Sequence, residues 1–151
     1  MQTISEAGIN FIKEFEKFRA RPYKDGGDFW TIGYGHKMSD VEIQEIKEVT
    51  HEEALEILKL DLQEAEYAVN SLITVPLAQN QFDALVSFAF NVGGGAFEGS
   101  TLRKLLNKGF YGVVPEQLNR WVNSSGQRLN GLVRRRKAEG RIFQDGVYDA
   151  K

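Results

Sequence analysis

The sequence predicts an α+β fold in which helices dominate and a small β segment follows the first helix. Apolar side chains recur at three- and four-residue spacing over residues 5–18 and over most of the chain after residue 50, which is the periodicity of amphipathic helices. Between residues 21 and 38, aromatic and β-branched residues are separated by glycines instead, a composition typical of short strands and turns. The 151 residues suffice for one domain, or for one domain with a small lobe attached.

The first helix is expected over residues 5–18, where Ile12 and Phe15 lie on its apolar side. Pro22 ends any helix before it. Residues 21–38 are then expected to form a short hairpin or a three-stranded sheet with glycine turns. A sheet of this size is not stable by itself in water, so it must pack against helices.

A polar connection is expected near residues 39–50. Thr50 and Glu53 match a capping box, and an apolar stripe of leucines, alanines and valines predicts a long helix after it. Pro76 separates this helix from a second one, which the three glycines from Gly93 stop. Shorter helical patterns follow at roughly residues 98–107, 113–122 and 132–143.

The order of these elements predicts a single domain over residues 1–151 with two lobes. The small N-terminal β lobe covers approximately residues 19–50, and the larger helical lobe covers approximately residues 51–151 together with the helix at 5–18. A long helix joins the two lobes. We expect the active site in the cleft between them, because clefts between lobes are common ligand sites.

Charge is distributed unevenly along the chain, although the formal net charge is only −2. Acidic residues dominate from Asp40 to Glu66, and basic residues dominate from Arg103 to Arg141. Such patterns are typical of solvated helix faces, but the basic part also suits a polyanionic partner, either a carboxylate-bearing cell wall or a nucleic acid. The run Arg134–Lys137 favours a nucleic acid, whereas the apolar residues interspersed around it favour a packed helix.

The absence of several residue types and motifs from the sequence limits the kinds of catalytic and metal site that the protein can have. The sequence contains no cysteine, which excludes disulfides and cysteine-containing metal sites. It contains no GxSxG, P-loop, GxGxxG or HExxH motif, and its two histidines are not at metal-ligand spacing, so we expect no metal and no cofactor. The N-terminus lacks the features of a signal peptide, and no apolar run is long enough for a membrane span. We therefore expect a cytoplasmic protein without membrane insertion.

Two carboxyl groups near the N-terminus have environments that suit glycoside hydrolysis. Glu16 is flanked by Phe15 and Phe18, and partial desolvation there is expected to raise the pKa of its carboxyl group and keep it protonated as a general acid. Asp25 lies in a wetter, glycine-bounded turn and is expected to stay ionised. Such a pair can protonate a glycosidic oxygen and activate water, which the hydroxyl of Thr31 could orient. By themselves, two acids at this spacing are far more typical of an ordinary surface than of a catalytic pair.

The segment FEKFRARPYKDGGDFWTIGYGH resembles the signature of the phage-type lysozymes, glycoside hydrolase family 24. In that family a Glu, eight residues, an Asp, five residues and a Thr form the catalytic triad, and Glu16, Asp25 and Thr31 match this spacing without a gap. The segment ALVSFAFNVGGGAFEGSTLRKLLNKG resembles the family's central helical block, and RWVNSSGQRLNGLVRRRKAEGRIF resembles its C-terminal block. The resemblance therefore covers nearly the whole chain, in the family's order.

The resemblance implies a lysozyme-like fold and a muramidase. Such an enzyme cleaves the β-1,4 bond between N-acetylmuramic acid and N-acetylglucosamine, with inversion, for host-cell lysis. It implies Glu16 as general acid, and Asp25 with Thr31 as the pair that positions and activates water. Inversion requires the two carboxyl groups to be about 6.5–9.5 Å apart, whereas retention requires about 5–5.5 Å.

The same resemblance implies residues that contact substrate. Phe90 and Asn91 match positions that line the cleft, and Thr101 or Ser100 matches a hydroxyl near the substrate. Phe90 suits a core aromatic residue equally well. Lys37 occupies a cleft position that is apolar in some relatives.

Other residues of the signature are expected to be structural. His36 matches a family histidine for which we expect a structural role. Gly33 and Gly35 are expected to serve turns and close approach of the backbone.

The implied partner is a peptidoglycan glycan strand, not a nucleic acid. We expect a monomer that stays in the host bacterial cytoplasm until a separate holin gives it access to the periplasm and cell wall. Two alternatives remain: a non-catalytic cell-wall glycan-binding module on the same fold, and a nucleic-acid-binding protein. The intact Glu, Asp and Thr set argues against the first. The second predicts an affinity that falls steeply with salt.

Overall fold

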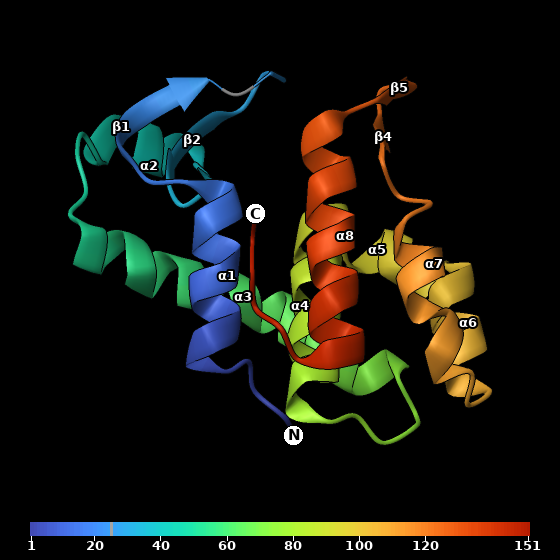
Figure 1. Cartoon of the computed structure of the whole chain (residues 1–151). Helices are drawn as coiled ribbons and strands as arrows, with labels where there is room; N and C mark the ends of the chain where they lie inside the picture. The colour runs from blue at the N-terminus through green and yellow to red at the C-terminus, as the bar shows by residue number, and fades with distance from the viewer. Residues whose placement is uncertain (25) are drawn as a thin grey trace. The chain divides into compact units, whose positions relative to one another are not determined.

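The computed structural model describes residues 1–24 and 26–151 (Figure 1). Its contacts divide the chain into two compact units. The sheet unit is Ile12–Gln63, and the helical unit is Met1–Phe11 together with Glu64–Lys151. Most of the described residues are helical and the strands form two small antiparallel sheets, so the predicted α+β class with dominant helix is confirmed.

The elements follow one another largely as predicted. Up to residue 72 they are α1 (Glu6–Glu16), β1 (Arg19–Lys24), β2 (Trp30–Gly33), β3 (His36–Lys37), α2 (Asp40–Glu45) and α3 (His51–Leu72). After residue 72 they are α4 (Gln79–Val92), α5 (Gly94–Glu98), α6 (Thr101–Asn107), the 3-10 helix η1 (Tyr111–Val113), α7 (Val114–Leu118), β4 (Asn123–Ser124), β5 (Gln127–Arg128) and α8 (Asn130–Asp145). Among the described residues, no helix combines the length and the apolar composition that crossing a bilayer requires.

The first helix ends at Glu16, two residues earlier than predicted. Lys17 adopts a left-handed conformation with φ of 58°, and its amide donates a hydrogen bond to the carbonyl of Lys13 at 2.9 Å. A left-handed residue directly after the last helical turn is a common way to end a helix. The chain then enters β1 at Arg19, which leaves Glu16 as the last residue of α1.

The predicted three-stranded sheet is present, with the antiparallel order β1-β2-β3. Tyr23 lies opposite Thr31 and Lys24 lies opposite Trp30 across β1 and β2, while Thr31 lies opposite Lys37 across β2 and β3. Side chains alternate between the two faces along a strand. Tyr23, Thr31 and Lys37 therefore share one face of the sheet, and Lys24 and Trp30 share the other.

Two capping boxes start the helices that follow the sheet. The predicted one is confirmed: the amide of Glu53 donates to the Thr50 hydroxyl at 3.1 Å, and the amide of Thr50 donates to the Glu53 carboxylate at 2.9 Å. The second box joins Ser39 and Glu42 in the same way and starts α2. The prediction of a polar connection over residues 39–50 was therefore wrong for the six residues of α2.

The core of the helical unit is built around α4. Residues 82–89 of this helix are all buried, and α8 packs against both α4 and α7. Gly93 ends α4 with φ of 94°, as predicted, but Gly94 and Gly95 then begin α5. The final helix is longer than the predicted 132–143, and the β4–β5 hairpin before it was not predicted.

A buried carboxylate joins three parts of the helical unit. Asp83 on α4 is 1% exposed and accepts hydrogen bonds from the amide and the hydroxyl of Ser5 and from the side chain of Gln79. The hydroxyl of Tyr148, in the segment after α8, donates to the same carboxylate at 2.6 Å. Burial and the Asp83 carboxylate both raise the pKa of Tyr148. The N-terminal residues and the segment after α8 are thus both bonded to α4.

Two of the four residues of the basic run on α8 are part of the core, as the packed-helix interpretation predicted, whereas Arg134 and Lys137 are exposed. Arg135 and Arg136 are 4% and 1% exposed, and Glu139 is fully buried. The Glu139 carboxylate accepts hydrogen bonds from Arg135 Nε at 3.3 Å, Arg136 Nη1 at 2.9 Å and the Ser87 hydroxyl of α4 at 2.6 Å. These two guanidinium groups therefore bind within the protein and are not exposed to a nucleic acid.

Candidate active site

Glu16 is held at the end of α1 against the turn between β2 and β3. Its side chain is half-buried, and a Cβ atom added to Gly35 would come within 2.6 Å of its carboxyl oxygen. Gly35 also has φ of 77°, a conformation that residues with side chains rarely adopt. The sequence predicted a glycine for close approach at this turn, and the group that approaches it is the predicted general acid.

Thr31 lies in the middle of the sheet, on β2. It is only 3% exposed, and its hydroxyl donates a hydrogen bond to the carbonyl of Phe29 at 3.3 Å. A hydroxyl that donates one hydrogen bond still has acceptor lone pairs. Thr31 can therefore accept a hydrogen bond from a water molecule.

Asp25 lies outside the residues that the structure describes. The predicted role of Asp25 stays a prediction.

Two cation–aromatic pairs flank Thr31 on its face of the sheet. On the β1 side, the guanidinium of Arg19 lies 4.3 Å from the ring centre of Tyr23. On the β3 side, the ammonium of Lys37 lies 4.6 Å from the ring centre of Phe29. Because Lys37 lies opposite Thr31, the ring of Phe29 that it contacts lies on the same side of the sheet. These pairs could not be predicted from the residue types, because the pairing depends on strand register.

A third pair of the same kind lies on the opposite face. The ammonium of Lys24 is 5.7 Å from the ring centre of Trp30, and these two residues are direct cross-strand neighbours. Phe29 is 55% exposed and Trp30 is 38% exposed. The end of the β1–β2 hairpin therefore presents an exposed ring with its own cation on each face.

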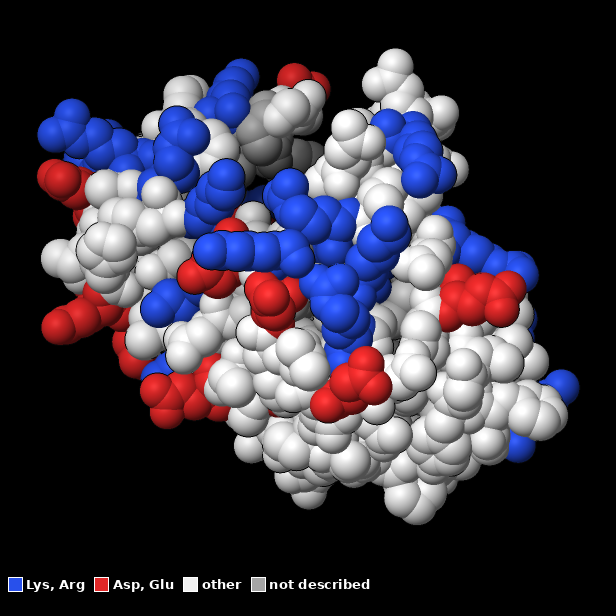
Figure 2. Space-filling model, viewed as in Figure 1, with Lys and Arg blue, Asp and Glu red and all other residues white. Residues whose placement is uncertain are grey.

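Basic side chains gather over the β1–β2 part of the molecule, as Figure 2 shows. The lysines and arginines within residues 12–38 are Lys13, Lys17, Arg19, Arg21, Lys24 and Lys37. None of these side chains forms an ion pair with a carboxylate of the described residues. Acidic residues instead dominate α2 and the first turns of α3, so positive charge in the sheet unit is concentrated on the sheet and the end of α1.

His36 binds two carboxylates on the other side of the sheet. Its Nδ1 atom lies 2.8 Å from Asp61 on α3, and its Nε2 atom lies 3.0 Å from Glu42 on α2. The hydrogen bond to Asp61 is the main reason why the pKa of His36 is raised to about 8. These contacts join β3 to both helices, which agrees with the structural role expected for this histidine.

The predicted substrate-binding residues belong to the helical unit. Phe90 is half-buried in the last turn of α4, and the exposed Asn91 after it accepts a hydrogen bond from Arg136 through its side-chain oxygen. Thr101 is the exposed first residue of α6. Ser100 is 2% exposed, and its hydroxyl caps α6 and donates to a carbonyl of α5. Of the two hydroxyl positions, only Thr101 is accessible, and the binding roles of all these residues stay predictions.

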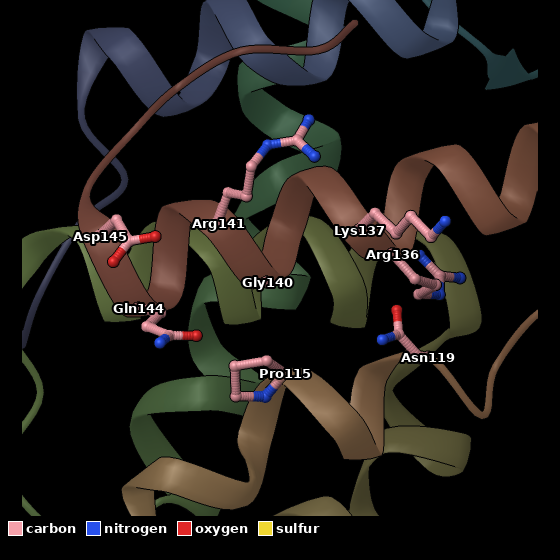
Figure 3. Close-up of a pocket in the computed structure, with 8 residues that line it drawn as sticks. All are labelled: Pro115, Asn119, Arg136, Lys137, Gly140, Arg141, Gln144 and Asp145. Carbon is pink, nitrogen blue, oxygen red and sulfur yellow. The ribbon is translucent and has the colours of Figure 1, made fainter.

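A groove of about 210 Å³ lies between α7 and α8 (Figure 3). The two helices approach closely there, since a Cβ atom on Gly140 would lie 3.4 Å from that of Pro115. Its rim is polar and contains Asn119, Lys137 and Gln144. None of the predicted catalytic or substrate-binding residues lines this groove, so it is not part of the candidate active site.

The described part of the candidate site has one of the two carboxyl groups that glycoside hydrolysis needs, together with a hydroxyl group. A half-buried carboxyl group is fixed at a helix end, and a hydroxyl that can accept from water lies in the adjoining sheet. A carboxylic acid can protonate the leaving oxygen of a glycoside, while the water must be activated by a second carboxylate. Among the predicted residues, Asp25 is the one assigned to that second role.

Comparison with known proteins identifies the family of this chain. The Phage lysozyme family model matches residues 13–139. The endolysin of Bacillus phage B103 is 44% identical over 145 residues, which are 95% of this chain and 54% of that protein. The chain thus spans about half the length of that curated relative.

Two solved structures are similar over nearly their whole length. The endolysin from Escherichia coli O157:H7 phage FAHEc1 is 35% identical, has a TM-score of 0.87, and covers 98% of this chain and 97% of its own. The muramidase domain of SpmX from Asticaccaulis excentricus is 39% identical, has a TM-score of 0.86, and covers 95% of this chain and 99% of its own. The lysozyme-like fold implied by the resemblance is therefore confirmed. The family model and these relatives together show that the chain belongs to the Phage lysozyme family.

Proposed function

We propose that this protein is a muramidase that hydrolyses the β-1,4 bond between N-acetylmuramic acid and N-acetylglucosamine in peptidoglycan. The observation that carries the proposal is the contact of the Glu16 carboxyl group with Gly35 in the unit that also holds Thr31. Membership of the Phage lysozyme family supports it. So does the similarity to a structure named as a muramidase domain.

In the proposed reaction Glu16 is the general acid. Its protonated carboxyl group donates its proton to the glycosidic oxygen as the bond from that oxygen to the anomeric carbon breaks. The packing of this carboxyl group against Gly35 limits the positions that it can adopt, which favours one direction of proton transfer. Fixed geometry of this kind is a large part of general-acid catalysis.

Water attacks the anomeric carbon from the opposite face. Asp25 takes one proton from this water, while the Thr31 hydroxyl accepts a hydrogen bond from it and orients it. The anomeric carbon then has inverted configuration. Asp25 returns to its ionised form by releasing the proton to solvent, and Glu16 regains a proton from solvent.

Substrate binding is assigned to Phe90, Asn91 and Thr101 in the helical unit. Phe90 offers part of an aromatic ring, and the other two offer exposed polar groups. Sugar rings bind to such combinations of apolar surface and hydrogen-bonding groups.

The biological setting is proposed from the endolysin relatives. We propose that the chain acts as one lysozyme domain, as a monomer and without a cofactor. It would be released to the cell wall through a lesion made by a separate holin, and there contribute to lysis of the bacterial host.

The proposal is tested with Glu16→Gln. The variant is expected to lose about 100- to 10,000-fold in turnover, measured as loss of turbidity of purified peptidoglycan, with an unchanged circular dichroism spectrum. Glu14→Gln is a matched control, because Glu14 is an exposed acid on the same helix. Muramic acid at the new reducing ends is the expected product of the unmodified protein.

Two results would contradict the proposal. Lysis by Glu16→Gln at the unmodified rate would exclude this residue as the acid. Binding of peptidoglycan by the unmodified protein without any new reducing ends would instead indicate a non-catalytic glycan-binding module.

A further inference from the structure

We propose that Arg19 and Lys37 give this protein a preference for glycan strands that carry carboxylates over neutral strands with the same β-1,4 backbone. The inference rests on the proposed function, and it names two specificity-determining residues for that reaction. The observation behind it is the position of the two cations. Both lie on the sheet face of Thr31, one on the β1 side and one on the β3 side.

Both cations are available to a ligand. Arg19 and Lys37 are exposed, and neither has a carboxylate partner among the residues that the structure describes. An unpaired, exposed cation can bind a carboxylate without first breaking an internal ion pair. The gain from such a contact is therefore not offset by the loss of another.

The aromatic rings hold the two cations in place without neutralising them. Tyr23 lies under the guanidinium of Arg19, and Phe29 lies under the ammonium of Lys37. A ring attracts a cation through its electron-rich face, but it accepts no conventional hydrogen bond from it. The N–H donors therefore stay free to bind carboxylate oxygens, while the side chains lose less conformational freedom on binding.

Peptidoglycan and chitin strands differ in the groups that these cations would bind. Each muramic acid carries a lactyl ether that continues into a peptide with carboxylates, whereas a chitin strand carries only N-acetyl and hydroxyl groups. In the proposed reaction Thr31 orients the attacking water, so the two cations that flank Thr31 on its face of the sheet lie near the cleaved bond. Carboxylates carried by neighbouring muramic acids are then within the reach of Arg19 or Lys37.

The sheet offers a matched control. Lys24 also lies over an aromatic ring, that of Trp30, but on the face opposite Thr31. A general attraction between the basic sheet and a polyanion would involve Lys24 as much as Lys37. Specific recognition next to the cleaved bond would involve Arg19 and Lys37 and leave Lys24 without effect.

The experiment measures binding without turnover, in full-length protein that carries Glu16→Gln. Its probes are soluble, uncross-linked peptidoglycan strands with intact peptides, and chitohexaose. Lys37→Gln and Arg19→Gln are each expected to weaken binding of peptidoglycan by about fivefold and to leave chitohexaose unchanged. Lys37→Arg is expected to retain the affinity, and Lys24→Gln to match the parent for both probes. Unchanged binding of chitohexaose also shows that each variant is folded.

Three outcomes overturn the inference. They are an unchanged affinity of Lys37→Gln and Arg19→Gln for peptidoglycan, an equal loss for both probes, and an equal loss in Lys24→Gln. Hydrolysis of peptidoglycan by the unmodified protein is measured in parallel. If that activity is present while the binding preference is absent, this inference alone fails, whereas absence of the activity means that the proposed function has failed.

Discussion

The imidazole of His36 and the carboxylate of Asp61 lie 2.8 Å apart and connect the last strand of the sheet to α3. Glu42 on α2 lies on the other side of the ring, at 3.0 Å. Both carboxylates favour the protonated imidazole, which is why the pKa of His36 is raised from 6.5 to about 8. The same contact therefore makes the stability of the fold depend on pH.

Stability is expected to fall between pH 6 and pH 9 because His36 loses its proton. A group whose pKa is raised by folding contributes its full stabilisation below its unfolded pKa of 6.5, and this contribution is lost as pH rises through about 8. The shift corresponds to about 2 kcal/mol, which solvent screening at this partly exposed site reduces to roughly 1 kcal/mol. The free energy of unfolding in urea, measured at both pH values, tests this.

Asp61→Asn is expected to remove most of this pH dependence. The difference in unfolding free energy between the unmodified protein and the variant should be larger at pH 6 than at pH 9. Glu56→Gln breaks an exposed pair with Lys59, whose ammonium stays charged over this range, so its effect should be constant. Equal differences for Asp61→Asn at both pH values would show that the charge of His36 does not contribute to stability through this contact.

Gly35→Ala is expected to reduce activity more than it reduces stability. The new methyl group would come within 2.6 Å of the Glu16 carboxyl oxygen, so the proposed acid must move. The positive φ of 77° adds backbone strain of about 1 kcal/mol. Gly126→Ala separates the backbone strain from the displacement of Glu16, because Gly126 has φ of 79° and no atom within 4 Å of an added Cβ. It should lose similar stability and retain full turnover of peptidoglycan.

Glu139→Gln is expected to destabilise the helical unit strongly. Arg135 and Arg136 are both buried and both donate to the Glu139 carboxylate. Removal of its charge takes a buried carboxylate partner away from both guanidinium groups, at a cost of about 3–5 kcal/mol. Glu116→Gln breaks an exposed pair with Arg120 at 3.6 Å and should cost less than about 1 kcal/mol. Similar urea midpoints for the two variants would contradict the assigned importance of the buried network.

Local features of the fold could be predicted because their signals lie within a few residues. The capping box of Thr50 and Glu53 needs only two side chains three positions apart, and it was predicted correctly. Ser39 and Glu42 have the same spacing, so that signal could have identified α2, but a helix of six residues has no apolar stripe to support it. The β4–β5 turn at Ser125 and Gly126 has positive φ at both residues, which serine seldom signals.

Features that depend on distant residues could not be predicted. The burial of Arg136 depends on Glu139 and on Trp121, whose carbonyl accepts from its Nε at 2.9 Å. The sequence of a basic run does not indicate whether its side chains contact solvent, a nucleic acid or a buried carboxylate. For the site, the spacing of Glu16 and Thr31 identified them through the family signature. Their surroundings, such as the approach of Glu16 to Gly35, required the fold.

Asp25→Ala is expected to lower turnover by at least about 100-fold, because water without a general base is a poor nucleophile. Asp28→Ala is the matched control, since Asp28 is an exposed carboxylate in the same connection between β1 and β2 and has no proposed role. Both variants are assayed by loss of turbidity of purified peptidoglycan, with circular dichroism to verify folding. The configuration of the newly formed reducing end, followed by NMR during early turnover of the unmodified protein, should be inverted. Full activity in Asp25→Ala would exclude this residue as the base, and retained configuration would indicate instead that a carboxylate attacks the sugar directly.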